Sequence, residues 1–169
     1  IINGKQGIRK EEMNMTTATA TQSELLEKYL RDSHVLNLAT CVNNRPSNRD
    51  VFYLMPDEFT NYIYITTPRN SNKMAEIEAN PHVSFTTVPT DDDNGVVTSN
   101  KAQIHLTDKA IDDVLPLLDN QIPEWTEVVG GAKETFVVLK LEFESVKFFG
   151  NQGINSVLID DQGVVTEEV

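Results

Sequence analysis

Six short runs rich in β-branched and aromatic residues occur between positions 34 and 149, and they constrain the fold more than any other feature. Runs of this composition, bounded by Asn, Asp, Gly and Pro, predict β-strands. The Asn43-Asn44 and Pro56-Asp57 pairs supply turns that reverse the chain. Strands in this order favour a mainly β fold that closes into an antiparallel barrel, because closure removes exposed sheet edges. The predicted strands are residues 34–42, 47–54, 62–66, 82–88, 96–106 and 135–149.

Three short helices are expected, one before the first strand and two between later strands. The first follows a cap at Ser23, where apolar residues recur at helical spacing. The second begins after a cap at Asn70 or Ser71 and ends at Asn80, because a proline follows. The third is expected at 107–118, capped by Thr107, and a loop is expected at 122–132.

The length of the chain favours one domain. Its 169 residues, 39% of them hydrophobic, suffice to bury one core. The polar stretch 1–22 lacks apolar periodicity, which predicts a flexible N-terminal arm. We expect the barrel domain at 23–150 and an acidic C-terminal tail at 151–169.

The net charge of −12 disfavours anionic partners, because most of the protein surface would repel them. We therefore expect a small molecule or a protein as partner, with no nucleic acid and no membrane.

Cys41 is the single cysteine, so it cannot form an intrachain disulfide, and its apolar strand predicts that it is buried. With no signal-peptide pattern and no long apolar run, a cytoplasmic location is expected.

No metal site is expected. The three histidines, His34, His82 and His105, are too widely spaced for a zinc motif. The acidic run that begins at Asp91 is similar to the start of a calcium loop, but its twelfth position is Ala102 instead of a glutamate. A polar turn that ends in glycine is the expected structure there.

Residues 45–73 contain the clearest functional signal. Here two predicted strands lead into the start of the second helix. Backbone N–H groups and hydroxyls at a helix start donate outward, the helix dipole adds partial positive charge, and Lys73 adds a full one. The window holds four basic and three acidic residues, a net charge of +1 within a chain of net charge −12. This combination predicts a binding site for a phosphate group.

Three motifs follow one another in order along the chain. They are Leu36-Asn37-Leu38-Ala39-Thr40-Cys41, then Arg45-Pro46-Ser47-Asn48-Arg49, and then Thr67, Ser71 and Lys73 ahead of Asn80-Pro81. Together they resemble the pyridoxamine 5′-phosphate oxidase-like family, in particular its small general stress protein branch, over about residues 25–150. The resemblance implies a six-stranded antiparallel FMN-binding split barrel that forms a homodimer, with FMN held between the two subunits.

The resemblance also implies a cofactor site. In it, Arg49 contacts the FMN phosphate or ribityl chain, and the backbone around Asp50 and Val51 borders the isoalloxazine ring. The start of the second helix holds the phosphate. The implied cofactor-binding residues are Arg49, Asp50, Val51, Thr66, Thr67, Ser71, Asn72 and Lys73.

Two departures from the true oxidases bear on activity. Leu54 stands where they place a lysine. Their C-terminal Arg-x-His substrate motif is missing, since no arginine or histidine follows Phe136. We therefore expect no oxidation of vitamin B6 phosphates.

Two functions stay open, because no catalytic side chain stands out. One is a flavin-dependent oxidoreductase that acts on an unknown small molecule and leaves the redox chemistry to the cofactor. The other is a non-catalytic flavin-binding or sensing module in the stress response. A different ligand, such as a deazaflavin or haem, is a third option. Trp125 is expected to pack its loop down in preference to stacking on a flavin.

Overall fold

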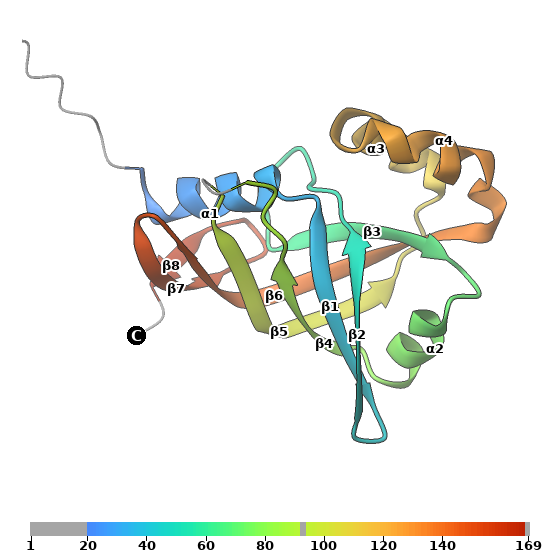
Figure 1. The fold of residues 1–169 in the computed structure, drawn as a ribbon, viewed down its shortest axis with the longest axis horizontal. Coiled ribbons are helices and arrows are strands. Elements are labelled where there is room, and N and C mark those ends of the chain that lie inside the picture. Colours follow the sequence, from blue (N-terminus) through green and yellow to red (C-terminus); the bar gives the residue numbers. More distant parts are fainter. Residues whose placement is uncertain (1–19, 92–93, 168–169) are drawn as a thin grey trace, which may run out of the picture.

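Eight strands and four helices follow one another in residues 20–91 and 94–167, which are the residues that the computed structural model describes (Figure 1). Residues 1–19 of the predicted arm, Asp92, Asp93 and the last two residues of the predicted tail lie outside the described part. The helices are α1 (Gln22–Asp32), α2 (Asn72–Ala79), α3 (Leu115–Gln121) and α4 (Pro123–Gly131), with single helical turns η1 (Ile111–Asp113) and η2 (Lys133–Thr135). The strands are β1 (Val35–Val42), β2 (Arg45–Phe52), β3 (Tyr62–Pro68), β4 (His82–Thr87), β5 (Val96–Leu106), β6 (Phe136–Gly150), β7 (Gly153–Ile159) and β8 (Val165–Glu167).

Strand pairing closes β1 to β6 into a barrel. β2, β1, β4, β5 and β6 are neighbours in that order, and β3 pairs with β6, all antiparallel. The ring closes where Leu54, just after β2, and Tyr64 of β3 exchange two backbone hydrogen bonds of 2.8 and 3.0 Å. The predicted mainly β barrel is therefore confirmed.

The long strand β6 allows the sheet to continue beyond the barrel. Its 15 residues pair with β3 in the first half, where Tyr62 lies opposite Glu142, and with β7 in the last part, where Gly150 lies opposite Gly153. β7 and β8 are strands beyond the six that the sequence predicts. Their sequence signal is weak, because the alternation expected of a half-buried strand is short and broken by polar residues and glycine.

The barrel interior is filled by apolar side chains at every second position. On β1, Leu36 and Leu38 are fully buried, and on β6, Leu139 and Leu141 are too, as the two-residue period of a strand requires. The same period corrects one prediction. Cys41 is exposed, because the inward positions of β1 fall on even-numbered residues.

The turn between β1 and β2 is the one that the sequence predicts. Asn43 and Asn44 have φ angles of 50° and 61°. These left-handed conformations are what a two-residue hairpin turn needs, and asparagine adopts them more readily than most residues. The hairpin therefore sets the register in which Leu38 lies opposite Arg49.

α1 begins earlier than the sequence predicts. Its N-cap is Thr21, whose hydroxyl accepts a hydrogen bond from the Glu24 N–H at 3.2 Å, while the Glu24 carboxylate accepts one from the Thr21 N–H at 2.7 Å. This reciprocal capping box provides acceptors for two N–H groups that have no hydrogen-bond partner within the helix. Leu26 and Leu30 are fully buried and join α1 to the barrel core.

The segment predicted as a loop at 122–132 forms α4, and the helix predicted at 107–118 is replaced by η1 and α3. Pro116 and Pro123 lie in the first turns of α3 and α4, where the missing N–H of proline costs nothing. These prolines therefore begin helices.

α3 and α4 cover one side of the barrel (Figure 1). The buried apolar residues there are Leu54, Tyr64, Ile111, Val114, Leu118, Ile122, Val129 and Val138.

His34, which joins α1 to β1, is half-buried. Its Nδ1 atom is enclosed and has no hydrogen-bond partner among residues 20–91 and 94–167. Burial lowers the pKa of His34 below its ordinary value of 6.5, although Glu124 and Asp32 act in the opposite direction.

We expect the free energy of unfolding to fall as the pH drops below 6.5, the ordinary pKa of histidine. The unfolded chain takes up a proton on His34 at that pH, whereas the folded protein resists protonation down to the lowered pKa. Urea unfolding over about pH 5 to 7 measures this slope. His34→Gln should flatten it, and replacing the exposed His105 by Gln should not. An unchanged slope in His34→Gln would contradict the assignment.

Candidate functional site

Polar side chains gather around Arg49 on β2. Arg49 lies opposite Leu38, so its side chain shares one face of the β1–β2 hairpin with Thr40, two residues further along β1. Arg49 Nη1 donates to Thr40 Oγ1 at 2.8 Å, and Nη2 donates to Glu76 Oε2 at 2.6 Å. Glu76 belongs to α2, so the ion pair ties the hairpin to that helix.

Lys73, in the first turn of α2, forms a second group of contacts. Its Nζ donates to Thr67 Oγ1 at 2.8 Å, and Thr67 Oγ1 lies 3.3 Å from Ser71 Oγ. Thr67, near the end of β3, is 2% exposed. Ser71 is the N-cap residue by position, as predicted, but its side chain makes no capping hydrogen bond. Its hydroxyl lies beside Thr67 instead.

The two groups of contacts form one charged cluster, because Arg49 and Glu76 act electrostatically on Lys73. We call it the Arg49–Lys73 cluster, and it consists of Thr40, Arg49, Thr67, Ser71, Lys73 and Glu76. Burial lowers the pKa of Lys73, repulsion from Arg49 lowers it further, and Glu76 raises it. The hydrogen bond from Thr40 and the charge of Arg49 lower the pKa of Glu76. The three charged groups therefore influence one another directly.

The path of the chain explains why three elements meet here. β3 ends at Pro68, α2 follows, and the chain returns to the barrel in β4 (Figure 1). Met74 and Ile77 of α2 are buried in the barrel core, which fixes the orientation of the helix. The first N–H groups of a helix have no partner within it, and its dipole favours an anion at this end.

The other predicted cofactor residues lie outside these hydrogen bonds. The exposed Asp50 accepts a hydrogen bond from Asn37 Nδ2 at 3.0 Å, and Val51 packs against the barrel core. Thr66 points to the opposite face of β3 from its neighbour, and Asn72 is exposed at the start of α2. Of the predicted set, the structure brings together Arg49, Thr67, Ser71 and Lys73.

Thr40 and Glu76 belong to the cluster but are absent from the predicted cofactor-binding residues, although Thr40 is part of the first of the three motifs. Thr40 continues the inward period of Leu36 and Leu38, and Glu76 follows Lys73 by about one helical turn. These spacings place each residue on a face, but they do not identify its partner on another element.

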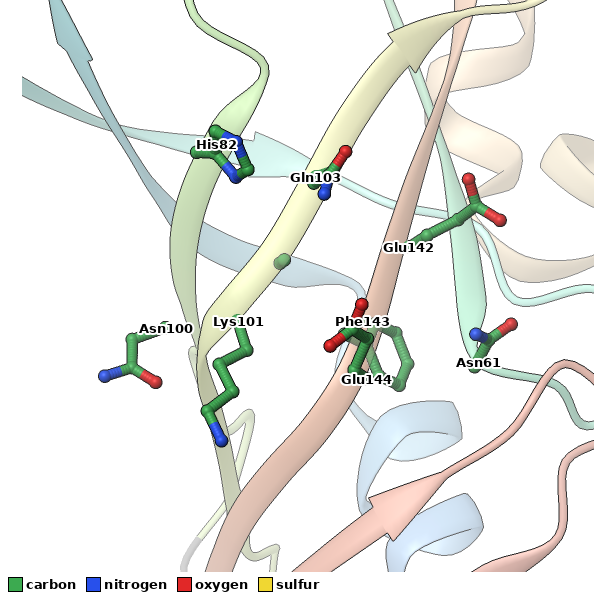
Figure 2. A pocket seen from close by; sticks show the side chains of 9 residues that line it. Asn61, His82, Asn100, Lys101, Gln103, Glu142, Phe143 and Glu144 are labelled. Atoms are coloured by element: carbon green, nitrogen blue, oxygen red, sulfur yellow. The ribbon is translucent and has the colours of Figure 1, made fainter.

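A separate cavity of about 440 Å³ lies over β4, β5 and β6 (Figure 2). None of the predicted cofactor residues lines this cavity. The labelled polar side chains around it are Asn61, His82, Asn100, Lys101, Gln103, Glu142 and Glu144.

Among residues 20–91 and 94–167, none of the helices combines the length and the apolar character needed to cross a membrane. Over the same part of the chain, His, Cys, Asp and Glu side chains form no group of three or more that could hold a metal ion.

The sequence model of one family, described as pyridoxamine 5′-phosphate oxidase-like, matches residues 31–154. The chain belongs to this family. The match spans every barrel strand, the α3–α4 helices and the Arg49–Lys73 cluster. No curated protein sequence matches the chain.

Several solved structures share the fold of this chain at low sequence identity. A pyridoxamine 5′-phosphate oxidase-related, FMN binding protein from Nostoc punctiforme is 20% identical, with a TM-score of 0.57 over 90% of this chain and 97% of that one. General stress protein 26 from Bacillus anthracis is 18% identical, with a TM-score of 0.55 over 75% and 92%. A heme binding protein from Mycobacterium smegmatis is 13% identical, with a TM-score of 0.65 over 83% of this chain and 59% of that one. The split-barrel fold is therefore shared by proteins that bind different cofactors.

Proposed function

We propose that the protein binds FMN and uses it as an oxidoreductase on a small molecule. The observation that carries this proposal is the convergence of two cationic side chains and two hydroxyls on the first two turns of α2. Arg49 reaches Glu76 from β2, and Lys73, Thr67 and Ser71 meet at the helix start. A phosphate monoester carries nearly two negative charges and several acceptor oxygens. The residues present, Arg49, Thr67, Ser71 and Lys73, suit that group.

The donor chemistry of the cluster fits a phosphate in two respects. Lys73 has three N–H donors, one of which is bonded to Thr67. Ser71 does not use its hydroxyl for capping. When Thr67 donates in the contact between the two hydroxyls, the Ser71 O–H is left to donate to a ligand at the same helix start. Bound FMN supplies the redox chemistry, and these residues hold and orient its phosphate. The FMN binding relative from Nostoc punctiforme supports the choice of flavin.

Spectra of the purified protein test the proposal. A flavin spectrum and saturable binding of added FMN are expected. A haem spectrum, or no flavin binding at all, would contradict it. NAD(P)H is then added under anaerobic conditions: reduction of the bound flavin supports an oxidoreductase, whereas lack of reduction with every donor tried favours the non-catalytic flavin-binding or sensing module.

We also propose that the protein is a homodimer in the cytoplasm. The side chains of Arg49 and Glu76 are each 23% exposed, so a flavin at the cluster would face solvent on one side of a single chain. A second subunit would cover it, as apolar ring systems seldom stay exposed. Light scattering at micromolar concentration should give twice the 19.0 kDa of one chain. A mass of one chain would contradict the dimer.

Pyridoxamine phosphate is not expected to be a substrate. The resemblance implies that the true oxidases place a lysine at the position of Leu54. In this chain Leu54 is buried in the apolar cluster below α3 and α4. No arginine or histidine follows Phe136. An aldehyde-trapping assay with pyridoxamine phosphate should show no product above background, and steady turnover by the FMN-loaded protein would contradict this prediction.

A further inference from the structure

The Arg49–Lys73 cluster contains a carboxylate in addition to its cations. Glu76 Oε2 accepts hydrogen bonds from Arg49 Nη2 and Thr40 Oγ1, both at 2.6 Å. Arg49 also donates to the same Thr40 hydroxyl, at 2.8 Å. The three side chains form a closed triangle, so the carboxylate is held in place.

Glu76 reduces the charge that the cluster offers to an anion. Arg49 and Lys73 carry two positive charges, and Glu76 cancels one of them. An incoming phosphate meets a guanidinium that already has an anionic partner, and it is repelled by that partner at short range. The hydrogen bond from Thr40 favours the ionised form of Glu76, so this opposition persists at neutral pH.

The carboxylate also has a role when no ligand is bound. Arg49 and Lys73 repel each other, and Glu76 attracts both. Without Glu76 the two cations would lie together, partly buried, with no negative charge between them, which costs free energy. The same residue thus stabilises the empty cluster and opposes the phosphate.

We infer that Glu76 is the residue that sets the phosphate affinity of this site, as a built-in anion that the phosphate must displace from Arg49. The inference rests on the proposed function, because it takes the cluster to be the phosphate site. Its consequence is a limited preference for FMN over riboflavin, which lacks the phosphate. Removal of the Glu76 charge should increase that preference.

The test compares Glu76→Gln with wild type and with Glu78→Gln, a matched control. Glu78 is an exposed carboxylate on the same helix, so its replacement changes the net charge equally. Fluorescence titrations measure the dissociation constants for FMN and riboflavin. Glu76→Gln should bind FMN about tenfold more tightly, the effect expected of one like charge removed at short range. Its riboflavin affinity, and both affinities of Glu78→Gln, should stay within about twofold of wild type.

Three outcomes would overturn the inference. If Glu76→Gln binds FMN with unchanged or weaker affinity, the inference is wrong, but the proposed function stays intact. Equal tightening of riboflavin also overturns the inference, because the effect would not involve the phosphate. Lack of FMN binding by wild type and both variants overturns the proposed function and the inference together.

A second measurement needs no flavin. Side-chain NMR of the Lys73 ammonium over alkaline pH gives its pKa in each variant. Because Glu76 raises that pKa, Glu76→Gln should lower it and Glu78→Gln should not. An identical Lys73 pKa in wild type and Glu76→Gln would show that the carboxylate does not act on the cluster, and the inference would be wrong.

Discussion

Lys73→Ala is expected to weaken FMN binding by roughly ten- to a hundredfold, since a charge-assisted hydrogen bond to phosphate contributes about 1.5–3 kcal/mol. Lys73→Glu should abolish measurable binding, because it replaces attraction by repulsion beside Glu76. Fold stability should change little, since Lys73 contributes no apolar contact to the barrel core. Titration of FMN into each dialysed variant, with thermal unfolding run in parallel, measures both quantities.

The matched control is Lys28→Ala. Lys28 is exposed and pairs with Asp32 on α1, away from α2 (Figure 1). Its removal changes the net charge equally and should leave FMN affinity nearly intact. Equal affinities for wild type and a folded Lys73→Ala would mean that the phosphate is held elsewhere.

The pH dependence of binding adds a signature of Lys73. Its pKa lies below the ordinary 10.5, mainly because of burial. As the pH rises through that lowered pKa, the lysine loses its charge and FMN affinity should decline. The decline should be absent in Lys73→Ala, whose remaining guanidinium at Arg49 does not titrate in this range.

Phe143→Ala is expected to cost about 3–5 kcal/mol of unfolding free energy, the range for deleting a buried aromatic ring. Phe143 is 1% exposed, and its ring lies 5.6 Å from that of Phe85, centroid to centroid. It sits on β6, the strand shared by the barrel and its extension. A cavity there would remove a large part of a stability that is typically about 5–15 kcal/mol. Urea unfolding at constant pH measures the loss.

Phe149→Ala provides the comparison on the same strand. Phe149 is 42% exposed, so removal of its ring should cost less than about 1 kcal/mol. If the two variants lost similar stability, the packing around Phe143 would not be what holds the barrel together. A large loss for Phe149 alone would indicate that a second subunit covers it.

Local sequence was sufficient to predict the strands of the barrel, the turn between the first two strands and the bounds of α2. Strand positions follow from β-branched and aromatic runs with a period of two, and the turn at Asn43-Asn44 follows from the ease with which asparagine takes a positive φ. The start of α2 follows from Ser71 and the stop at Asn80-Pro81. Each of these signals depends on a few neighbouring residues, so no knowledge of distant contacts is needed. The position of Lys73 at this helix start could be predicted for the same reason, whereas Arg49 was assigned to the site through the family resemblance.

Tertiary structure alone decided which side chains meet. Glu76 contacts Arg49 and Thr40 because barrel closure brings α2 against the β1–β2 hairpin, across 27 and 36 residues of sequence. The conversion of 122–132 into α4 likewise depends on burial of Ile122 and Val129 in the apolar cluster that contains Leu118, which outweighs the glycines of that segment. Periodicity identifies the face on which a residue lies, but long-range packing selects the partner on that face. The charge balance of the candidate phosphate site was therefore set by the fold.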